Sequence, residues 1–335
     1  MTKVLITGCA GYIGSIAADL FLKSKYQVVG IDNFQTGYKK PVEFLENKFG
    51  KDNFKFYETD LKNDLSTIFN KEKGIEAVVH YAASCLVDES VRLPGKYFFN
   101  NVAVTSNLLA AMDKFNINNI IFSSTCAVYG EAEYYPIDEK HPLKPTSPYG
   151  ASKNMAEEVI QWYGKLKKFN YMILRYFNVC GATDDGTIGD SKKPSTLLVQ
   201  NAVRGALGIE KFYLTCPEVD TPDKTPIRDY IDVVDLNEAH LKALEYLISS
   251  KKSGIINLGT GTGYSVLDVV NQVKKLTGKD IPIEKANTRL GDDAKKIANI
   301  ELANKILGWQ PKRTINDSVK SLLIWYKSHP NGWER

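Results

Sequence analysis

The stretch Val4-Leu-Ile-Thr-Gly8-Cys-Ala-Gly11-Tyr-Ile-Gly14 decides the fold. A short run suited to a β-strand leads through three glycines into residues 15–22, whose pattern is typical of a helix. Glycine lets the backbone approach a ligand closely, and a helix N-terminus offers free N–H groups and a partial positive charge to a pyrophosphate. Gly8, Gly11 and Gly14 are therefore predicted to bind a dinucleotide, although their spacing is GxxGxxG rather than GxGxxG.

An acidic residue at the end of the second predicted strand indicates which dinucleotide would bind. Residues 27–31 form this strand, and Asp32 follows it, 18 positions after Gly14. A carboxylate about 20 residues beyond such a turn hydrogen-bonds the adenosine ribose hydroxyls. Because it would repel the 2′-phosphate of NADP, the sequence favours NAD.

Strand and helix patterns continue to alternate along the chain. Residues 54–58 end near Asp60, which could hydrogen-bond the adenine amine, and residues 77–81 end at Ala82 and Ala83, which are small enough for a cofactor to lie close. Alternation of this kind predicts an α/β protein with a Rossmann-type doubly wound parallel sheet, whose ligands bind beyond the carboxyl ends of the strands. We expect a smaller C-terminal α/β portion to bind the substrate.

A tyrosine and a lysine lie four residues apart at the start of a predicted helix. Pro148 precedes Tyr149, and the helix pattern continues through Lys153. Residues at this spacing share one helix face, so the hydroxyl and the ammonium can point into one cleft. The lysine and an oxidised nicotinamide ring would lower the pKa of Tyr149 toward neutrality and make it a general base. Taken alone, such a pair is an ordinary exposed helix pair.

Three signals in order resemble the extended short-chain dehydrogenase/reductase superfamily: the glycine turn, hydroxyls at residues 123–125 after the fifth predicted strand, and the Tyr149/Lys153 pair. Further segments resemble the UDP-glucose (UDP-galactose) 4-epimerase family over nearly the whole chain. They are Gly11-Tyr-Ile-Gly14, Ser123-Ser-Thr-Cys-Ala-Val-Tyr-Gly130, Ser147-Pro-Tyr-Gly150, Leu174-Arg-Tyr-Phe-Asn178, Ile227-Arg-Asp-Tyr-Ile231, Asn257-Leu-Gly-Thr-Gly-Thr-Gly-Tyr-Ser265 and Arg289-Leu-Gly-Asp292.

The resemblance implies a role for each matching residue. Tyr149 would be the base, Lys153 its electrostatic partner and a ribose ligand, and Thr125 the hydroxyl that bridges to the sugar 4-OH. Residues implied along NAD are Gly8, Gly11, Tyr12, Ile13, Gly14, Asp32, Asn33, Asp60, Leu61, Tyr81, Ala82, Ala83, Asn100, Tyr149, Lys153 and Phe177. Residues implied along the UDP-sugar are Thr125, Asn178, Arg228, Arg289, Asp292 and Lys296.

The activity implied is NAD-dependent inversion of the C4 hydroxyl of a UDP-hexose through a 4-keto intermediate. Since the hydride returns to the sugar, NAD would stay bound. The resemblance also implies a homodimer formed through helices near residues 97–115 and 149–166. It implies an NAD-binding domain of residues 1–179 plus roughly 228–250, and a nucleotide-sugar-binding domain of residues 180–227 and 251–335.

Three positions depart from the family pattern. Cys85 stands where a lysine commonly contacts the cofactor, so one phosphate or ribose contact would be lost. Thr196 replaces an amide or imidazole that often meets the nucleotide. Lys296 lies where side-chain bulk tunes acceptance of an N-acetyl group, so we expect UDP-GlcNAc to be disfavoured and an acidic or pentose sugar to be an alternative.

Other activities remain as alternatives. One is a 4-epimerase of another UDP-sugar, whether N-acetylated, pentose or uronate. A dehydratase would need an acidic pair where Cys126 and Ala127 stand, and a net reductase would need exchangeable NADPH, which Asp32 disfavours. A non-catalytic dinucleotide-binding protein would not need Thr125, Tyr149 and Lys153 together.

Composition limits the partners. The net charge of +4 comes from 43 basic and 39 acidic residues that are mixed along the chain, so no nucleic-acid or membrane partner is expected. Five cysteines without a CxxC pair favour a reducing compartment, taken as the cytoplasm, and no metal site is predicted. The glycines of residues 259–263 are expected to form a turn, because no acid-ended strand follows them.

Overall fold

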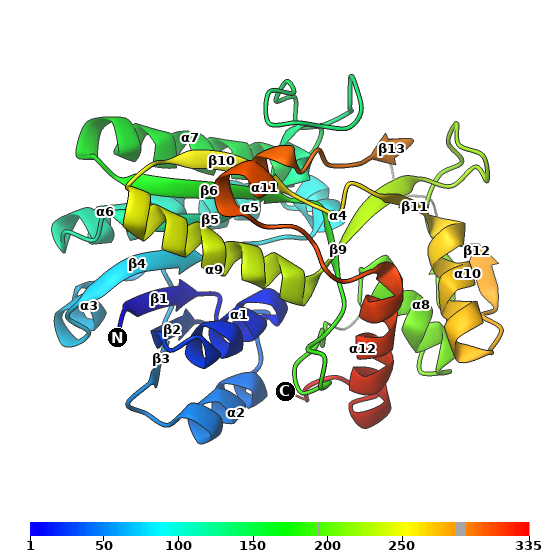
Figure 1. Ribbon diagram of the computed structural model, residues 1–335, viewed down its shortest axis with the longest axis horizontal. Helices are drawn as coiled ribbons and strands as arrows, with labels where there is room; N and C mark the ends of the chain where they lie inside the picture. Colours follow the sequence, from blue (N-terminus) through cyan, green and yellow to red (C-terminus); the bar gives the residue numbers. More distant parts are fainter. Residues whose placement is uncertain (193–194, 286–292, 335) are drawn as a thin grey trace.

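A seven-stranded parallel sheet forms the centre of the computed structural model, which describes residues 1–192, 195–285 and 293–334. The strand order is β3-β2-β1-β4-β5-β6-β10 (Figure 1). The strands are β1 (Lys3–Thr7), β2 (Gln27–Asp32), β3 (Phe54–Glu58), β4 (Ile75–His80), β5 (Asn119–Thr125), β6 (Asn170–Tyr176) and β10 (Gly254–Leu258). The order reverses between β1 and β4, which places the ligand crevice at their carboxyl ends. The predicted Rossmann-type fold is confirmed.

Helices cover both faces of this sheet, so its central strands are almost wholly apolar and buried. The helices α1 (Tyr12–Lys23), α2 (Lys39–Phe49), α9 (Val233–Ser250) and α11 (Glu301–Leu307) pack on one face. The helices α3 (Ser66–Lys71), α6 (Val104–Lys114) and α7 (Pro148–Lys167) pack on the other. Short helices α4 (Val87–Arg92), α5 (Pro94–Phe98) and η1 (Phe99–Ala103) lead into α6.

A smaller α/β portion lies beside the sheet, at the right of Figure 1. Its strand β9 (Ile227–Asp232) pairs with β7 (Asn178–Cys180), β11 (Gly263–Ser265) and β13 (Lys295–Lys296). A second pair joins β8 (Phe212–Leu214) to β12 (Ile283–Lys285). The helices α8 (Leu198–Ala206), α10 (Val266–Thr277) and α12 (Ile315–Ser328) enclose a separate apolar core.

Two strands cross the boundary that we predicted between the portions. β10 pairs with β6 in the large sheet, although residues 251–335 were assigned to the second domain. β9 belongs to the small sheet, although residues 228–250 were assigned to the first. Backbone pairing over a long distance decides both memberships, and sequence order does not reveal it. The division into an NAD-binding and a nucleotide-sugar-binding domain stays a prediction.

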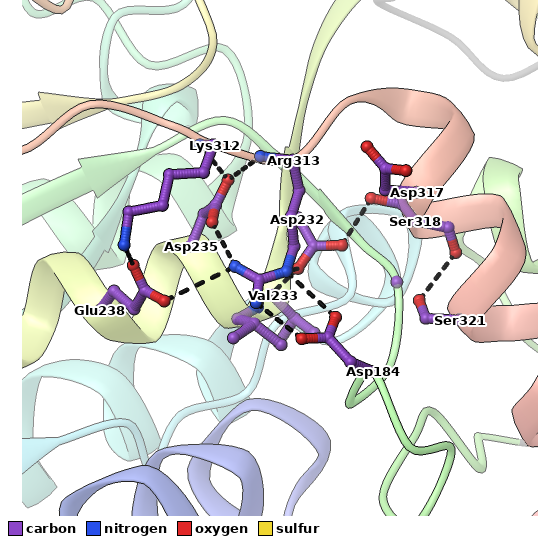
Figure 2. Close-up of polar contacts among 12 residues, drawn as sticks. Asp184, Asp232, Val233, Asp235, Glu238, Lys312, Arg313, Asp317, Ser318 and Ser321 are labelled. Carbon is purple, nitrogen blue, oxygen red and sulfur yellow. Dashed lines mark hydrogen bonds and ion pairs between the residues drawn. The ribbon is translucent and has the colours of Figure 1, made fainter. Parts of the chain in front are cut away.

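A cluster of charged side chains joins the two portions around Arg313 (Figure 2). The Arg313 guanidinium donates to Asp235 at the start of α9 at 2.6 Å and to Asp184 in the loop after β7 at 2.7 Å. Asp232, the last residue of β9, accepts from the Ser318 hydroxyl of α12 at 2.6 Å. Burial raises the pKa of Asp232 to about 7. The cluster therefore fixes α9, α12 and the loop after β7 relative to one another.

Candidate active site

In the glycine turn after β1, backbone atoms pack so closely that side chains on the glycines would not fit. A Cβ on Gly14 would lie 2.1 Å from the carbonyl oxygen of Gly8, and a Cβ on Gly8 would lie 2.7 Å from the backbone nitrogen of Ala82. Gly8 also has a φ of +71°, which other residues rarely adopt. α1 begins at Tyr12 with Gly11 as its N-cap and no capping side chain. The free N–H groups of this helix end fit the pyrophosphate of NAD.

Three polar residues gather where an adenosine would lie. Asp32 accepts from the backbone N–H of Ala10 at 3.1 Å and of Phe34 at 2.8 Å. Burial raises the pKa of Asp32, and these N–H groups oppose the rise. Asn33 donates to Asp60 at 3.0 Å across neighbouring strand ends. Together they offer carboxylate and amide groups to ribose hydroxyls and an adenine amine.

The end of β4 forms the other wall of the crevice. Tyr81 donates its backbone N–H to Thr7 at 3.2 Å and its hydroxyl to Asn237 of α9 at 2.9 Å. The small residues Ala82 and Ala83 follow Tyr81 directly. The wall is completed by Asn100, which donates to Ser84 at 3.0 Å.

Other predicted cofactor residues have structural contacts of their own. The Tyr12 hydroxyl donates to Gly181 O at 2.5 Å, and Ile13 O accepts from Asn237 at 3.3 Å. Leu61 is buried beside the strand ends. Phe177 is buried in a cluster that also contains Ile137.

The helix predicted at Tyr149 is α7, and it places the tyrosine and the lysine in the same cleft. Ser147 caps the helix by accepting from the Gly150 N–H at 3.1 Å, and Pro148 fills its first turn. Tyr149 and Lys153 are both buried on the inner face of the helix. Thr125, the last residue of β5, lies beside Tyr149 and acts to lower the pKa of its hydroxyl. The three predicted catalytic residues are therefore in one place.

Burial shifts the pKa values of Tyr149 and Lys153 in opposite directions. Burial raises the pKa of Tyr149 well above its ordinary value, and Thr125 only partly opposes this. Burial lowers the pKa of Lys153 to about 8, and its Nζ lies 4.2 Å from the centroid of the Phe122 ring. The protein's own groups thus do not bring the pKa of Tyr149 toward neutrality, because the effect of desolvation exceeds that of Thr125.

A buried ion pair holds this helix against the sheet. Glu157 follows Lys153 by one helical turn on the same face and is fully buried. Arg175 of β6 donates to both of its carboxylate oxygens, at 3.0 Å from Nε and 2.6 Å from Nη2. The Ser124 hydroxyl of β5 donates to the same carboxylate. The pair fixes α7 to the two strands beside Tyr149. Sequence reasoning missed it, although a charged residue inside an apolar strand was a usable signal.

A cavity of about 130 Å³ opens in the smaller portion. The predicted substrate residues Asn178 and Arg228 line it, and so does Thr196. The Arg228 guanidinium donates to Asp293 O at 2.8 Å, which orients its fork. Arg289 and Asp292 lie outside the described residues.

Lys296 lies on β13, and its charge is paired with that of Asp293. Its Nζ is 2.5 Å from Asp293 Oδ2, and both side chains are largely buried. Both act on Cys126, the residue after Thr125: burial mainly raises the pKa of its thiol, Lys296 lowers it and Asp293 raises it. The Lys296 ammonium therefore acts on the residue after Thr125, and Asp293 partly neutralises its charge, which the sequence did not indicate.

The structure also brings together two residues from opposite sides of the crevice. Lys192 Nζ donates to the sulfur of Cys85 at 3.2 Å, over a separation of 107 residues. Lys192 also lines a small cavity beside the glycine turn, together with Gly11, Tyr12 and Thr36. Sequence reasoning missed both Lys192 and Thr36, although Thr36 lies only four residues after Asp32.

Neither a metal site nor a membrane-spanning helix is found in residues 1–192, 195–285 and 293–334. No group of three His, Cys, Asp or Glu side chains there could hold a metal ion. No helix in those ranges is both long and apolar enough to span a bilayer.

Comparison with known proteins identifies the family. The family model described as "NAD dependent epimerase/dehydratase family" matches residues 4–259. The chain belongs to this family. A UDP-glucose 4-epimerase of Lactobacillus helveticus is 41% identical over 336 residues, 99% of this chain and 99% of that protein. UDP-arabinose 4-epimerase 1 of Arabidopsis thaliana is 38% identical over 99% of this chain and 81% of its own length.

A solved structure of this family closely matches the fold. UDP-glucose 4-epimerase from Bifidobacterium longum, in complex with NAD+ and UDP, superposes with a TM-score of 0.93 at 36% identity. The match covers 99% of this chain and 100% of that chain. The likeness therefore extends through both portions and is not confined to the dinucleotide-binding half.

Replacement of Glu157 by alanine tests the buried ion pair. E157A leaves the Arg175 guanidinium buried without its partner, and we expect the free energy of unfolding to fall by about 3–5 kcal/mol. Glu158, the neighbouring exposed residue, provides a matched control, because E158A should change the free energy of unfolding by less than about 0.5 kcal/mol. Urea denaturation followed by circular dichroism measures both values. Equal stability of the two variants would show that the pair does not hold α7 in place.

Proposed function

We propose that the protein is a UDP-hexose 4-epimerase that interconverts UDP-galactose and UDP-glucose with NAD as a bound cofactor. The observation that carries this proposal is the burial of Thr125, Tyr149 and Lys153 in one cleft, where Thr125 at the end of β5 acts on the Tyr149 hydroxyl and Lys153 lies one turn further along α7. The family membership, the full-length likeness to UDP-glucose 4-epimerases and the complex of one neighbour with NAD+ and UDP support it.

The side chains suit proton transfer at a sugar hydroxyl. Bound NAD supplies the means of taking a hydride from C4 and returning it to the opposite face of the 4-keto sugar. Beside the Lys153 ammonium and the positive charge of an oxidised nicotinamide, Tyr149 would lose its proton, and its phenolate oxygen would then accept the proton of the 4-hydroxyl and later return it. Thr125, at the end of β5 beside Tyr149, would orient that hydroxyl. Burial of all three residues excludes water from this step.

Recognition of the nucleotide is assigned to the smaller portion. Arginine binds phosphate oxygens with a fixed fork and stays charged, which suits Arg228 in the cavity beside Asn178. Arg289, Asp292 and Lys296 are assigned to the same UDP-sugar. The dinucleotide is assigned to the glycine turn, to Asp32, Asn33 and Asp60, and to the residues that follow β4.

Cofactor release and a turnover assay test the function. We expect denatured protein to release NAD, and native protein to convert UDP-galactose into UDP-glucose without added NAD. Y149F should lower kcat by roughly 10²–10⁴-fold while the bound NAD is unchanged, because it removes the proton acceptor and little else. Y163F, on the same helix, is the control and should keep full activity. Protein that neither releases NAD nor turns over would refute the epimerase assignment.

Sugar choice is assigned to Lys296. Relatives at similar identity act on UDP-glucose or UDP-arabinose by their names, so a pentose remains the second candidate substrate. The long Lys296 side chain is held by Asp293. In this proposal it would fill the space that an N-acetyl group needs. We therefore favour unmodified sugars, and the pairing of the ammonium weakens the case for an acidic one.

Rates on two substrates measure this choice. We expect UDP-galactose to react at least about tenfold faster than UDP-GlcNAc. K296A should lower this ratio of rates, because removal of the side chain admits the acetyl group. K295A, one residue earlier, should leave the ratio unchanged. A wild-type preference for UDP-GlcNAc would contradict the assignment.

We also propose a homodimer and a cytoplasmic location. Large apolar side chains are exposed on α7 and on the π-helix η1 that packs against it, among them Phe99 at 52%, Trp162 at 56% and Leu166 at 67%. A second copy of the chain would cover such a face. The five cysteines are unpaired, as suits a reducing compartment.

Light scattering after gel filtration tests the dimer. We expect the mass of two chains, and of one chain for W162E, because a charge cannot be buried at the apolar contact. Tyr213 is 49% exposed on β8, outside this face, so Y213E should keep the wild-type mass. A monomeric wild-type protein would rule the dimer out.

A further inference from the structure

The backbone around Lys192 is anchored from three directions. The preceding residue, Ser191, accepts from the Tyr38 hydroxyl through its carbonyl oxygen at 2.5 Å and from the Trp333 N–H through its hydroxyl at 2.9 Å. The carbonyl oxygen of Asp190 accepts from Trp325 Nε1 at 3.0 Å. The donors are Tyr38, which directly precedes α2 of the large portion, Trp333 near the C-terminus, and Trp325 of α12. The position of Lys192 is therefore fixed by both portions of the molecule.

The Lys192 side chain lies along the cofactor crevice. It lines the cavity beside Gly11 and Tyr12, at the uncapped N-terminus of α1. Its Nζ reaches Cys85, on the segment that follows β4, at 3.2 Å from the sulfur. The lysine thus crosses the crevice from the smaller portion, between the two strand ends where a dinucleotide binds in this fold.

The ammonium of Lys192 has few hydrogen-bond acceptors for its N–H groups among the described residues. An ammonium carries three donors, whereas the acceptor within hydrogen-bond reach of Nζ among the described residues is the sulfur of Cys85, a weak one. Cys85, Asp190 and Tyr176 all act to raise the pKa of Lys192, so the group is charged. The Asp190 carboxylate is also buried, and it accepts from Ser195 and from the Lys192 backbone N–H. A partly desolvated cation with a weak acceptor suits an anionic ligand.

We propose that Lys192 binds a phosphate of NAD from the smaller portion of the molecule and thereby slows release of the cofactor. The inference rests on the proposed function, because it takes NAD to be the bound dinucleotide. Phosphate oxygens would accept hydrogen bonds from the remaining N–H donors of the ammonium, next to the free N–H groups of α1. Retention of the cofactor is then shared between the glycine turn and a segment about 180 residues later.

The rate of NAD release from purified holoprotein tests this role. After a timed gel filtration, NAD that remains bound is freed by denaturation and measured for each variant. K192M should release NAD at least about tenfold faster than wild type, which matches the loss of one charged hydrogen bond. K192R should stay near the wild-type rate because it keeps the charge. K275M, an exposed lysine on α10, is the matched control and should behave as wild type.

A double variant moves the cation across the crevice. C85K/K192M places a lysine where the sulfur now accepts from Lys192, and we expect slow NAD release to return. K192Q gives a second neutral variant if K192M fails to fold, which thermal unfolding would reveal. If K192M or K192Q folds and holds NAD as tightly as wild type, Lys192 has no such role. Wild-type protein that carries no NAD would instead refute the proposed function itself.

Discussion

The active-site arrangement depends on the buried pair of Glu157 and Arg175. The pair spans α7 and β6, and the Ser124 hydroxyl adds β5, so one carboxylate joins the three elements around the reacting groups. Tyr149 and Lys153 precede Glu157 on the same helix face, and Thr125 follows Ser124 on β5. A carboxylate buried to this degree is stable only with its partner, so the geometry is held strictly. The contact between Thr125 and Tyr149 follows from this constraint.

Close backbone packing holds the geometry of the glycine turn, where the cofactor is proposed to bind. The carbonyl of Gly8 leaves no room for a side chain on Gly14, and Gly8 itself lies against Ala82. The ends of β1 and β4 are therefore pressed together beside the N-terminus of α1, which leaves N–H groups facing the crevice. The proposed reaction needs this proximity, because the dinucleotide would run from Asp32 at one end to Tyr149 at the other.

The two portions of the molecule are joined by both apolar and polar contacts. Val179 of β7 and Ile231 of β9 belong to the same apolar cluster as α1 and α9. Arg313 links Asp235 to Asp184 (Figure 2). The Tyr12 hydroxyl of α1 donates to Gly181 O in the loop after β7. The Arg313–Asp235 and Tyr12–Gly181 contacts each join a donor on one portion to an acceptor on the other. The cavity that contains Arg228 is thereby held in a set position relative to the Tyr149 cleft, which a reaction on a nucleotide-linked sugar requires.

The sequence by itself determined the parallel α/β fold, the glycine turn, the helix at Tyr149 and the family, because each depends on local spacing of a few residue types. It could not assign β9 and β10 to their sheets, since strand pairing over long distances leaves no local pattern. It also could not foresee the partners of Glu157, Lys192 and Lys296, or the raised pKa of Tyr149. Those depend on burial and on atoms brought together from distant segments, which only the tertiary structure decides.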